Sequence, residues 1–334
     1  SYSVTGVQTC ALPIYAIAYS PFSGFIDPFG GIDDIRKGII KTVGNADERF
    51  NEDPLRMMRA VRFHAALGFK IEEGTMSSIR RNHKLLEYIS KERIRDEFVK
   101  TILASPDSVK ILLDTGLMDY IVPRAKIMVG FDQNNKHHNM NLLDHTISVM
   151  NNVPNTVVLR LAAFLHDIGK PFTASIGEDG FSHFYMHGEE SAKLSLSILN
   201  DLKFDGATKN RVLDLVRLHD MPLTRKTIKR TIAKLGVDFV EDLLVLKRAD
   251  VKSQNFTEVK LNTLNISEQY FIKALNEPCH LSQLNVNGTD LIQIGIPQGK
   301  QIGQILAQLL EMVQDEPELN DKGVLLNIAK LLSW

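Results

Sequence analysis

The sequence is poor in cysteine and has no long apolar segment. Its 334 residues contain two cysteines, Cys10 and Cys279, which excludes a disulfide framework and a multi-cysteine zinc module. A reducing, cytoplasmic setting is therefore expected. No apolar run reaches the roughly 18 residues that a membrane span needs, and no Lys or Arg before Arg36 supplies the positive region of a secretory signal. We expect no membrane partner.

An excess of charge of either sign is also missing. Lys and Arg number 39 against 40 Asp and Glu, which excludes a uniformly basic protein that wraps nucleic acid but not a local basic face. Between residues 36 and 110, 16 Lys and Arg stand against 11 Asp and Glu, so basic charge is concentrated there. The length favours about two domains or several helical modules.

Hydrophobic periodicity predicts a mainly α-helical chain beyond residue 32. The preceding stretch predicts a strand, a Gly/Pro turn and a helix start with Asp33 and Asp34 in its first turn, as at the end of a sheet domain. Asp53 is placed as an N-cap and Pro54 as the first residue of a helix. Further helices are predicted over Glu73–Tyr88, Lys91–Ala104, Leu142–Asn151, Thr156–Ile168, Glu189–Leu202, Lys209–Leu218, Thr227–Lys234 and Val240–Asp250, with a loop at Thr173–His187.

A series of histidines and aspartates predicts a divalent-metal site in the middle of the chain. An imidazole and a carboxylate at the end of the apolar helix 157–165 cost several kcal/mol to bury unless they are paired or ligate a cation. Imidazole nitrogen and carboxylate oxygen suit Zn, Fe, Mn or Ni better than Ca, and Mg remains open. The alternative is a set of satisfied core histidines. The predicted ligands are His145, His166, Asp167, His187, His219 and Asp250.

The adjacent pair His166 and Asp167 is the predicted catalytic centre. Neighbouring helix residues point about 100° apart, so the pair can straddle one ion, or Asp167 can bridge two. We expect such a centre to polarise a phosphate group and activate a water molecule for its hydrolysis. Lys170 and Arg230 are plausible phosphate-binding groups, although the basic run 225–234 that contains Arg230 is equally consistent with a solvated helix face.

These residues resemble the HD-domain phosphohydrolase superfamily. The matching motifs are DHT at 144–146, LHDIGKP at 165–171, HGEES at 187–191, VRLHD at 216–220 and KRADVKSQN at 247–255. The resemblance implies a helical bundle that binds one or two divalent metals and hydrolyses phosphate esters.

A second polar pattern lies on the helix after Asp53. Asp53, Arg56, Arg59 and Arg62 recur every third residue and form one inclined ridge. A fixed carboxylate and a guanidinium one turn later present an acceptor and donors that can read the edge of a nucleobase. The alternative is an ion pair on a basic surface helix.

Three segments together resemble bacterial CCA-adding tRNA nucleotidyltransferases and poly(A) polymerases of class II. They are residues 26–69, which contain DPFGG and EDPLR, SKERIRDEFVKTI at 90–102, and LNVNGTDLIQIGIPQGKQIGQIL at 284–306. The resemblance runs from about Ala16 to the C-terminus. It implies tRNA as partner, CTP and ATP as substrates with Mg²⁺ for the transfer, and Asp53 and Arg56 on the incoming base. Arg59 and Arg62 then belong to the same nucleotide site.

The same resemblance implies a division of the chain and a missing part. Residues 1–14 look like an unrelated leader, 15–46 like the remnant of a nucleotidyltransferase head, 47–130 like the neck, 131–265 like the phosphohydrolase bundle and 266–334 like a helical tRNA-binding tail. The family's Gly-rich loop and DxD pair do not precede Ala16, and QTCALPIY replaces the start of the RRDFTINAIAY motif. We therefore expect no nucleotide addition by this polypeptide. A stand-alone phosphohydrolase and a non-catalytic tRNA-binding module remain open.

Overall fold

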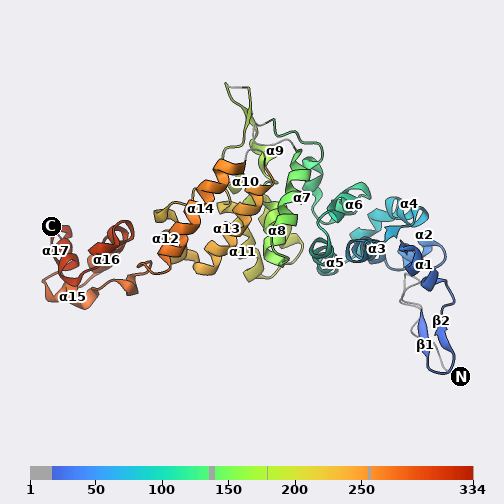
Figure 1. The fold of residues 1–334 in the computed structure, drawn as a ribbon, viewed down its shortest axis with the longest axis horizontal. Coiled ribbons are helices and arrows are strands. Elements are labelled where there is room, and N and C mark those ends of the chain that lie inside the picture. Colours follow the sequence, from blue (N-terminus) through green and yellow to red (C-terminus); the bar gives the residue numbers. More distant parts are fainter. Residues whose placement is uncertain (1–16, 135–139, 179, 255–256, 334) are drawn as a thin grey trace. The chain divides into compact units, whose positions relative to one another are not determined.

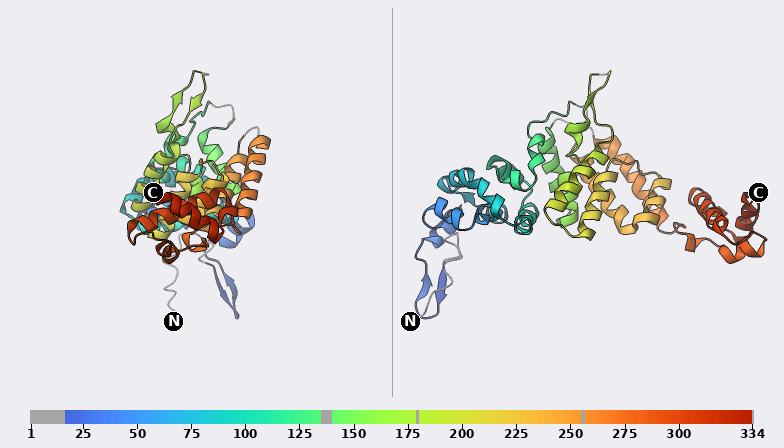
Figure 2. Two further views of the ribbon diagram at one scale, coloured as in Figure 1. Left: turned by 90° about the vertical axis from the view of Figure 1, so that its left-hand side faces the viewer. Right: turned by 180° about the vertical axis from the view of Figure 1, so that it is seen from behind.

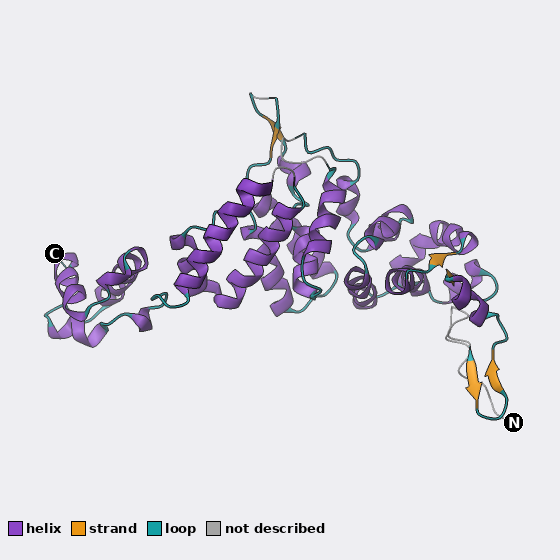
Figure 3. Ribbon diagram, viewed as in Figure 1, coloured by secondary structure: helices purple, strands orange, loops and turns teal. Residues whose placement is uncertain are grey.

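The computed structural model describes residues 17–134, 140–178, 180–254 and 257–333, and the prediction of a mainly α-helical chain is confirmed (Figures 1 and 3). The chain forms two compact units. The first contains the described residues up to 217 together with 253 and 254, and the second contains 218–252 and 257–333. Figure 2 shows the ribbon from two further sides. Within the described ranges, no helix has the length and apolar character to cross a bilayer.

The first unit opens with short strands. β1 (Ala18–Ser20) pairs antiparallel with β2 (Gly24–Ile26), and β3 (Ile39–Ile40) pairs in parallel with β4 (Lys70–Ile71). Between them, the Asp27 carboxylate accepts hydrogen bonds from the backbone N–H groups that start α1 (Gly31–Lys37). The end of the predicted sheet domain is therefore a two-stranded hairpin within the described residues.

A group of neck helices follows, built around α3 and α5. The helices are α2 (Ala46–Glu52), α3 (Leu55–Leu67), α4 (Glu73–Asn82), α5 (Lys91–Ala104) and α6 (Ser108–Asp114). Met58 and Val61 of α3 and Phe98 of α5 are fully buried. The Asp53 carboxylate accepts from the Leu55 N–H at 3.2 Å. Pro54, predicted as the first helical residue, is instead the N-cap of α3, which begins at Leu55. The predicted helix 73–88 was too long, because its last six residues form a 3-10 helix, His83–Tyr88.

The rest of the first unit is a helical bundle. It consists of α7 (Leu142–Asn152), α8 (Val157–Leu165), α9 (Lys170–Thr173), α10 (His187–Asp201) and α11 (Gly206–Leu218). Phe98 meets Phe164 of α8 edge-on at 5.7 Å between ring centroids, which joins the neck to the bundle inside one core. The segment 173–187, predicted as a loop, contains the hairpin of β5 (Ser175–Ile176) and β6 (Ser182–His183).

The second unit consists of six α-helices in its described residues. They are α12 (Arg225–Leu235), α13 (Val237–Lys252), α14 (Thr257–Ala274), α15 (Gly288–Gln293), α16 (Lys300–Asp315) and α17 (Lys322–Leu332). Leu291, Ile305, Leu309 and Leu325 form a core among the last three. α14 was not predicted as one helix, and it runs through residue 265, where the sequence placed a domain boundary. Other 3-10 helices of the chain are Leu117–Tyr120, Pro123–Met128, Leu281–Gln283 and Pro317–Leu319.

Candidate functional site

Four of the six predicted metal ligands lie together in the bundle of the first unit. His145 comes from the first turn of α7, His166 and Asp167 follow the last residue of α8, and His187 is the first residue of α10. The apolar sequence of α8 buries its C-terminal end, as predicted. His145 and His166 are fully buried, Asp167 is 2% exposed and His187 is 8% exposed.

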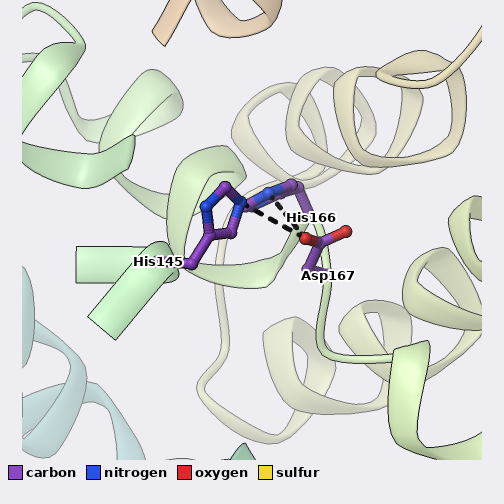
Figure 4. Close-up of side chains that lie close together, drawn as sticks. All are labelled: His145, His166 and Asp167. Atoms are coloured by element: carbon purple, nitrogen blue, oxygen red, sulfur yellow. Dashed lines mark ion pairs between the residues drawn. The ribbon is translucent and has the colours of Figure 1, made fainter. Parts of the chain in front are cut away.

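The Asp167 carboxylate is the common centre of this cluster. Its Oδ2 lies 3.1 Å from His166 Nε2 and 3.5 Å from His145 Nε2, and its Oδ1 lies 3.3 Å from His187 Nε2. Figure 4 shows the rings of His145 and His166 turned toward Asp167. The ligand atoms of His145, His166 and Asp167 all lie within 4.8 Å of one another, so a single ion can reach them all.

In each of the three histidines, a contact between Nδ1 and a backbone carbonyl leaves Nε2 to face the Asp167 carboxylate. His166 Nδ1 lies 2.8 Å from the Ala163 carbonyl oxygen, and His187 Nδ1 lies 2.8 Å from that of Phe184. His145 Nδ1 lies 3.3 Å from the Ser253 carbonyl oxygen. A carbonyl oxygen only accepts, so Nδ1 donates, and the lone pair of a neutral ring is then on Nε2. Metal-binding histidines are oriented in the same way. The lone pairs of three Nε2 atoms and the oxygens of one carboxylate repel one another unless a proton or a cation lies between them.

Lys170 brings positive charge to the same carboxylate. Its Nζ lies 2.7 Å from Asp167 Oδ2 and donates to the buried Gln133 Oε1 at 2.9 Å. Burial raises the pKa of Asp167, but His166, Lys170 and His187 outweigh burial and hold this pKa well below its usual range. Burial lowers the pKa of His187, whereas its hydrogen bond to Asp167 raises it, and the pKa lies above the usual value. An ionised carboxylate among imidazoles is a donor set that fits a divalent cation.

Two glycines let α10 approach its neighbours at this point: Gly169, just before α9, and Gly188, which meets Arg217 of α11. The Gly169 N–H donates to the buried Ser191 Oγ at 2.9 Å, and a Cβ on Gly169 would lie 2.5 Å from the Ser191 nitrogen. A Cβ on Gly188 would lie 2.9 Å from the Arg217 carbonyl oxygen. Gln133 and Ser191 are site residues that sequence reasoning missed. A glutamine in a linker-like stretch and a serine in a helix carry no local signal of such contacts.

The other two predicted ligands belong to the second unit. His219 is 5% exposed, and its carbonyl oxygen accepts from Lys247 Nζ at 2.5 Å. Asp250 lies half-buried in α13. Burial lowers the pKa of Lys247. The negative charges of Asp220 and Asp250 raise this pKa but do not outweigh burial. That His219 and Asp250 are ligands stays a prediction.

The basic run of α12 is largely paired with acids of the second unit. Arg225 Nη2 and Lys229 Nζ lie 2.7 and 2.6 Å from the Glu277 carboxylate, and Lys229 is fully buried. Lys226 pairs with Asp315 at 2.9 Å, and Arg230 pairs with Glu311. Four of its cations are therefore held in ion pairs, while Arg230 and Lys234 remain exposed to solvent. Phosphate binding by Arg230 stays a prediction.

The ridge predicted to bind nucleotide, Asp53, Arg56, Arg59 and Arg62, lies in the neck of the first unit. Arg56, 7% exposed, pairs with Glu52 at 2.6 Å, and Arg62 pairs with Glu97 at 2.6 Å. Asp53 pairs with Arg93 at 3.2 Å. The half-buried Arg59 has no side-chain hydrogen bond or ion pair within the described residues. It is the member of the ridge whose guanidinium remains available to a ligand.

Comparison with known proteins identifies the relatives of the chain. A family model described as the probable RNA and SrmB-binding site of polymerase A matches residues 68–128, and a putative tRNA nucleotidyltransferase domain 2 matches 178–329. The chain is 28% identical over 318 residues to the A-adding tRNA nucleotidyltransferase of Deinococcus radiodurans (89% of this chain, 72% of that protein). It is 29% identical over 320 residues to the CCA-adding enzyme of Lactobacillus johnsonii (95% and 70%).

A solved structure shows the same fold. The crystal structure of the Bacillus stearothermophilus CCA-adding enzyme in complex with CTP superposes with a TM-score of 0.67 at 24% identity, over 96% of this chain and 72% of that one. The sequence motifs, the family models and the fold agree. In these three respects the chain is similar to tRNA nucleotidyltransferases, among them the CCA-adding enzymes.

Proposed function

We propose that the chain is the tRNA-holding part of an enzyme that builds or repairs the 3′ CCA end of tRNA, joined to an HD-type phosphohydrolase site. The relatives named A-adding and CCA-adding match it over 89% and 95% of its length. tRNA is the proposed partner, CTP and ATP are the substrates of the intact enzyme, and Mg²⁺ serves the transfer. The cytoplasm is the proposed location, because tRNA is handled there.

The proposed division of labour follows the chain. Residues 15–46 belong to the nucleotidyltransferase head, 47–130 to the neck, 131–265 to the phosphohydrolase bundle and 266–334 to the tail that holds tRNA. The leader proposed for 1–14 lies outside the described residues. In the neck, Asp53 and Arg56 are the groups proposed to pair with the incoming base, and Arg59 and Arg62 belong to the same nucleotide site. Glu52 and Glu97 hold Arg56 and Arg62 in ion pairs.

Nucleotidyl transfer is not expected of the 334 residues by themselves. The transfer depends on carboxylate-held metal ions that neutralise phosphate charge, and on positioning of the nucleotide. The sequence contains no DxD pair. The neck can therefore contact a nucleotide without directing its chemistry.

The convergence of three imidazole Nε2 atoms on the Asp167 carboxylate carries the proposal of a hydrolase site. His145, His166, Asp167 and His187 would hold a divalent ion (Zn, Mn, Fe, Ni or Mg), which when bound polarises a phosphate and lowers the pKa of a water molecule. Lys170, 7% exposed, attracts the phosphate and orients it toward His166 and Asp167. The sequence series adds His219 and Asp250 to the proposed ligand set. The substrate is a phosphate monoester or a 2′,3′-cyclic phosphate.

One preparation of the full chain tests these proposals. We expect metal-dependent hydrolysis of a nucleoside 2′,3′-cyclic phosphate, and no addition of CMP or AMP to tRNA that lacks its 3′ end, with CTP, ATP and Mg²⁺ present. The double substitution His166→Ala, Asp167→Ala should remove bound metal and lower turnover by about 100-fold or more, because it deletes ligands rather than their supporting contacts.

A matched control is His64→Ala. His64 Nδ1 also contacts a backbone carbonyl, at 2.7 Å, but the residue lies in the neck, so metal content and turnover should stay at wild-type values. If the double variant keeps wild-type metal content and turnover, the proposed hydrolase site is wrong. Hydrolysis without tRNA binding would favour a stand-alone phosphohydrolase, and salt-dependent tRNA binding without hydrolysis would favour a binding module.

A further inference from the structure

The turn that leads into α10 contains a residue in an unusual backbone conformation. Met186 has φ 60° and ψ 19°, in the left-handed region that glycine normally occupies. Within the described ranges, the other residues besides glycine with a positive φ are Asn134 and Lys203. Such a conformation costs free energy, so it persists only where the surrounding structure requires it, often at a functional site.

Met186 is the third residue of a four-residue turn whose last residue is the proposed ligand His187. The His187 N–H donates to the Phe184 carbonyl at 3.2 Å, and His187 Nδ1 contacts the same carbonyl at 2.8 Å. A positive φ at the third position is typical of a type II turn, where glycine usually supplies it. The Phe184 carbonyl thus orients both the backbone and the ring of His187.

Both ends of this turn lie against groups that meet the Asp167 carboxylate. The Phe184 ring centroid is 5.5 Å from Lys170 Nζ, and that nitrogen lies 2.7 Å from Asp167 Oδ2. His187 Nε2 lies 3.3 Å from Asp167 Oδ1. The turn is therefore held at Phe184 and at His187, and the conformation of Met186 between them lets both contacts form at once.

The backbone of Met186 serves the turn and the helix, whereas its side chain lies largely in solvent. The residue is 73% exposed. Its carbonyl oxygen accepts from the Glu190 N–H at 3.2 Å, which is the first helical hydrogen bond of α10. Met186 therefore closes the turn and starts the helix whose first residue is His187.

We propose that Met186 is a positioning residue, whose left-handed backbone holds the His187 ring so that Nε2 faces Asp167 and a bound divalent ion. The inference rests on the proposed hydrolase site and adds to it a residue outside the predicted ligand series. It makes branching at the Cβ of residue 186 the critical property. A β-branched residue is strongly disfavoured at this φ, whereas leucine, unbranched at Cβ, is disfavoured no more than methionine.

Two isomeric substitutions in the full chain test the proposal. Met186→Ile places a branched Cβ at this φ, and Met186→Leu has the same atoms without that branch. When the metal-free chain is titrated with Mn²⁺ in a calorimeter, Met186→Ile should raise the Kd by about 10-fold or more, the usual effect of losing a contact that orients a ligand. Met186→Leu and Met186→Gly should stay within about twofold of the wild type. Met186→Thr repeats the test with a smaller β-branched side chain.

Lys203→Ile is the matched control for a general loss of stability. Lys203 also has a positive φ, 56°, but it lies beyond the opposite end of α10, more than about 20 Å away along the helix. This substitution should lower Tm as Met186→Ile does, and it should leave the Kd for Mn²⁺ unchanged. An equal rise of Kd in both isoleucine variants, or in Met186→Ile and Met186→Leu, would overturn the proposal.

A second measurement does not depend on the metal. In buffer with EDTA, Met186→Ile should speed hydrogen exchange of the His187 amide by about 10-fold or more, because the hydrogen bond of this amide to Phe184 closes the turn. Met186→Leu should not change this rate. Such a change in a chain whose wild type binds no Mn²⁺ would overturn the metal site and keep the role of Met186. Mn²⁺ binding with equal Kd in wild type and Met186→Ile, or with unchanged exchange, would overturn the role of Met186 and keep the metal site.

Discussion

Gly169→Ala tests whether the close approach of α9 and α10 builds the candidate site. The added Cβ would lie 2.5 Å from the Ser191 backbone nitrogen and 2.8 Å from the His187 carbonyl oxygen. Ordinary contact begins near 3.4 Å, so backbone atoms must move by about 0.9 Å. Gly169 has φ −83° and ψ −17°, which alanine adopts easily, so the clash and not the backbone conformation is the cause.

The magnitude follows from three contributions. Overpacking of a tight core costs about 1–3 kcal/mol, and the hydrogen bond from Gly169 to Ser191, 2.9 Å long, contributes about 1 kcal/mol. Alanine returns about 0.4–1 kcal/mol by restricting the unfolded chain. We expect a net loss of about 2–3 kcal/mol in the free energy of unfolding, or about 5–10 °C in Tm. Because the displaced turn carries His187, metal affinity should fall by about tenfold or more.

The assay is urea denaturation of the metal-free chain, with metal content measured separately by mass spectrometry. Gly206→Ala is the matched control. Gly206 begins α11, has no positive φ, and would have no atom within 4 Å of an added Cβ, so alanine should leave stability unchanged or slightly raised. Equal stability and equal metal content in the two variants would refute the conclusion that the close packing of α9 against α10 builds the site.

Two further predictions concern the second unit. Lys229→Met should lower the free energy of unfolding, measured by urea denaturation, by about 3 kcal/mol, because it leaves the Glu277 carboxylate, 18% exposed, without its buried partner. As a control, Lys234→Met on the exposed face of α12 should change this free energy by less than about 0.5 kcal/mol. Equal effects of the two substitutions would contradict the role of the buried pair. Burial raises the pKa of Glu277, but hydrogen bonds from Lys229 and Arg225 outweigh it and leave this pKa below 4.5. Its stabilising contribution is therefore present above the unfolded pKa and is lost as pH falls through the folded value. In the wild type, the amides of α12 and α16 should therefore be less protected against hydrogen exchange below about pH 5. The same pH dependence of protection in Glu277→Gln would refute the contribution of the ionised Glu277 carboxylate.

Local pattern was enough to predict most of the helices. The apolar period of α3, the Asp53 carboxylate at its start and the continuous apolar face of α8 depend on residues within a few turns of one another, so the sequence carried them directly. Helix ends were less well predicted. The 3-10 turn at His83–Tyr88 and the hairpin in 173–187 are fixed by contacts with distant residues, such as Asn134 for the hairpin.

For the candidate site, the sequence supplied the residue types and the fold supplied their partners. The series His145, His166, Asp167 and His187 was visible along the chain, and these side chains lie around one carboxylate. Their role as ligands stays a prediction. The pairing of α12 cations with Glu277, Glu311 and Asp315 was invisible, because the partners lie 50 to 90 positions further on.

The sequence by itself determined the resemblance to tRNA nucleotidyltransferases, the helical periodicity and the identity of the ionisable groups, since these are properties of residue order. Only the tertiary structure decided which groups meet. The contact between His145 and Ser253 spans 108 residues, and Gln133 reaches Lys170 across 37. Burial and side-chain partners depend on how the chain closes over such distances, and that closure is a sum of many weak contacts that no local pattern records.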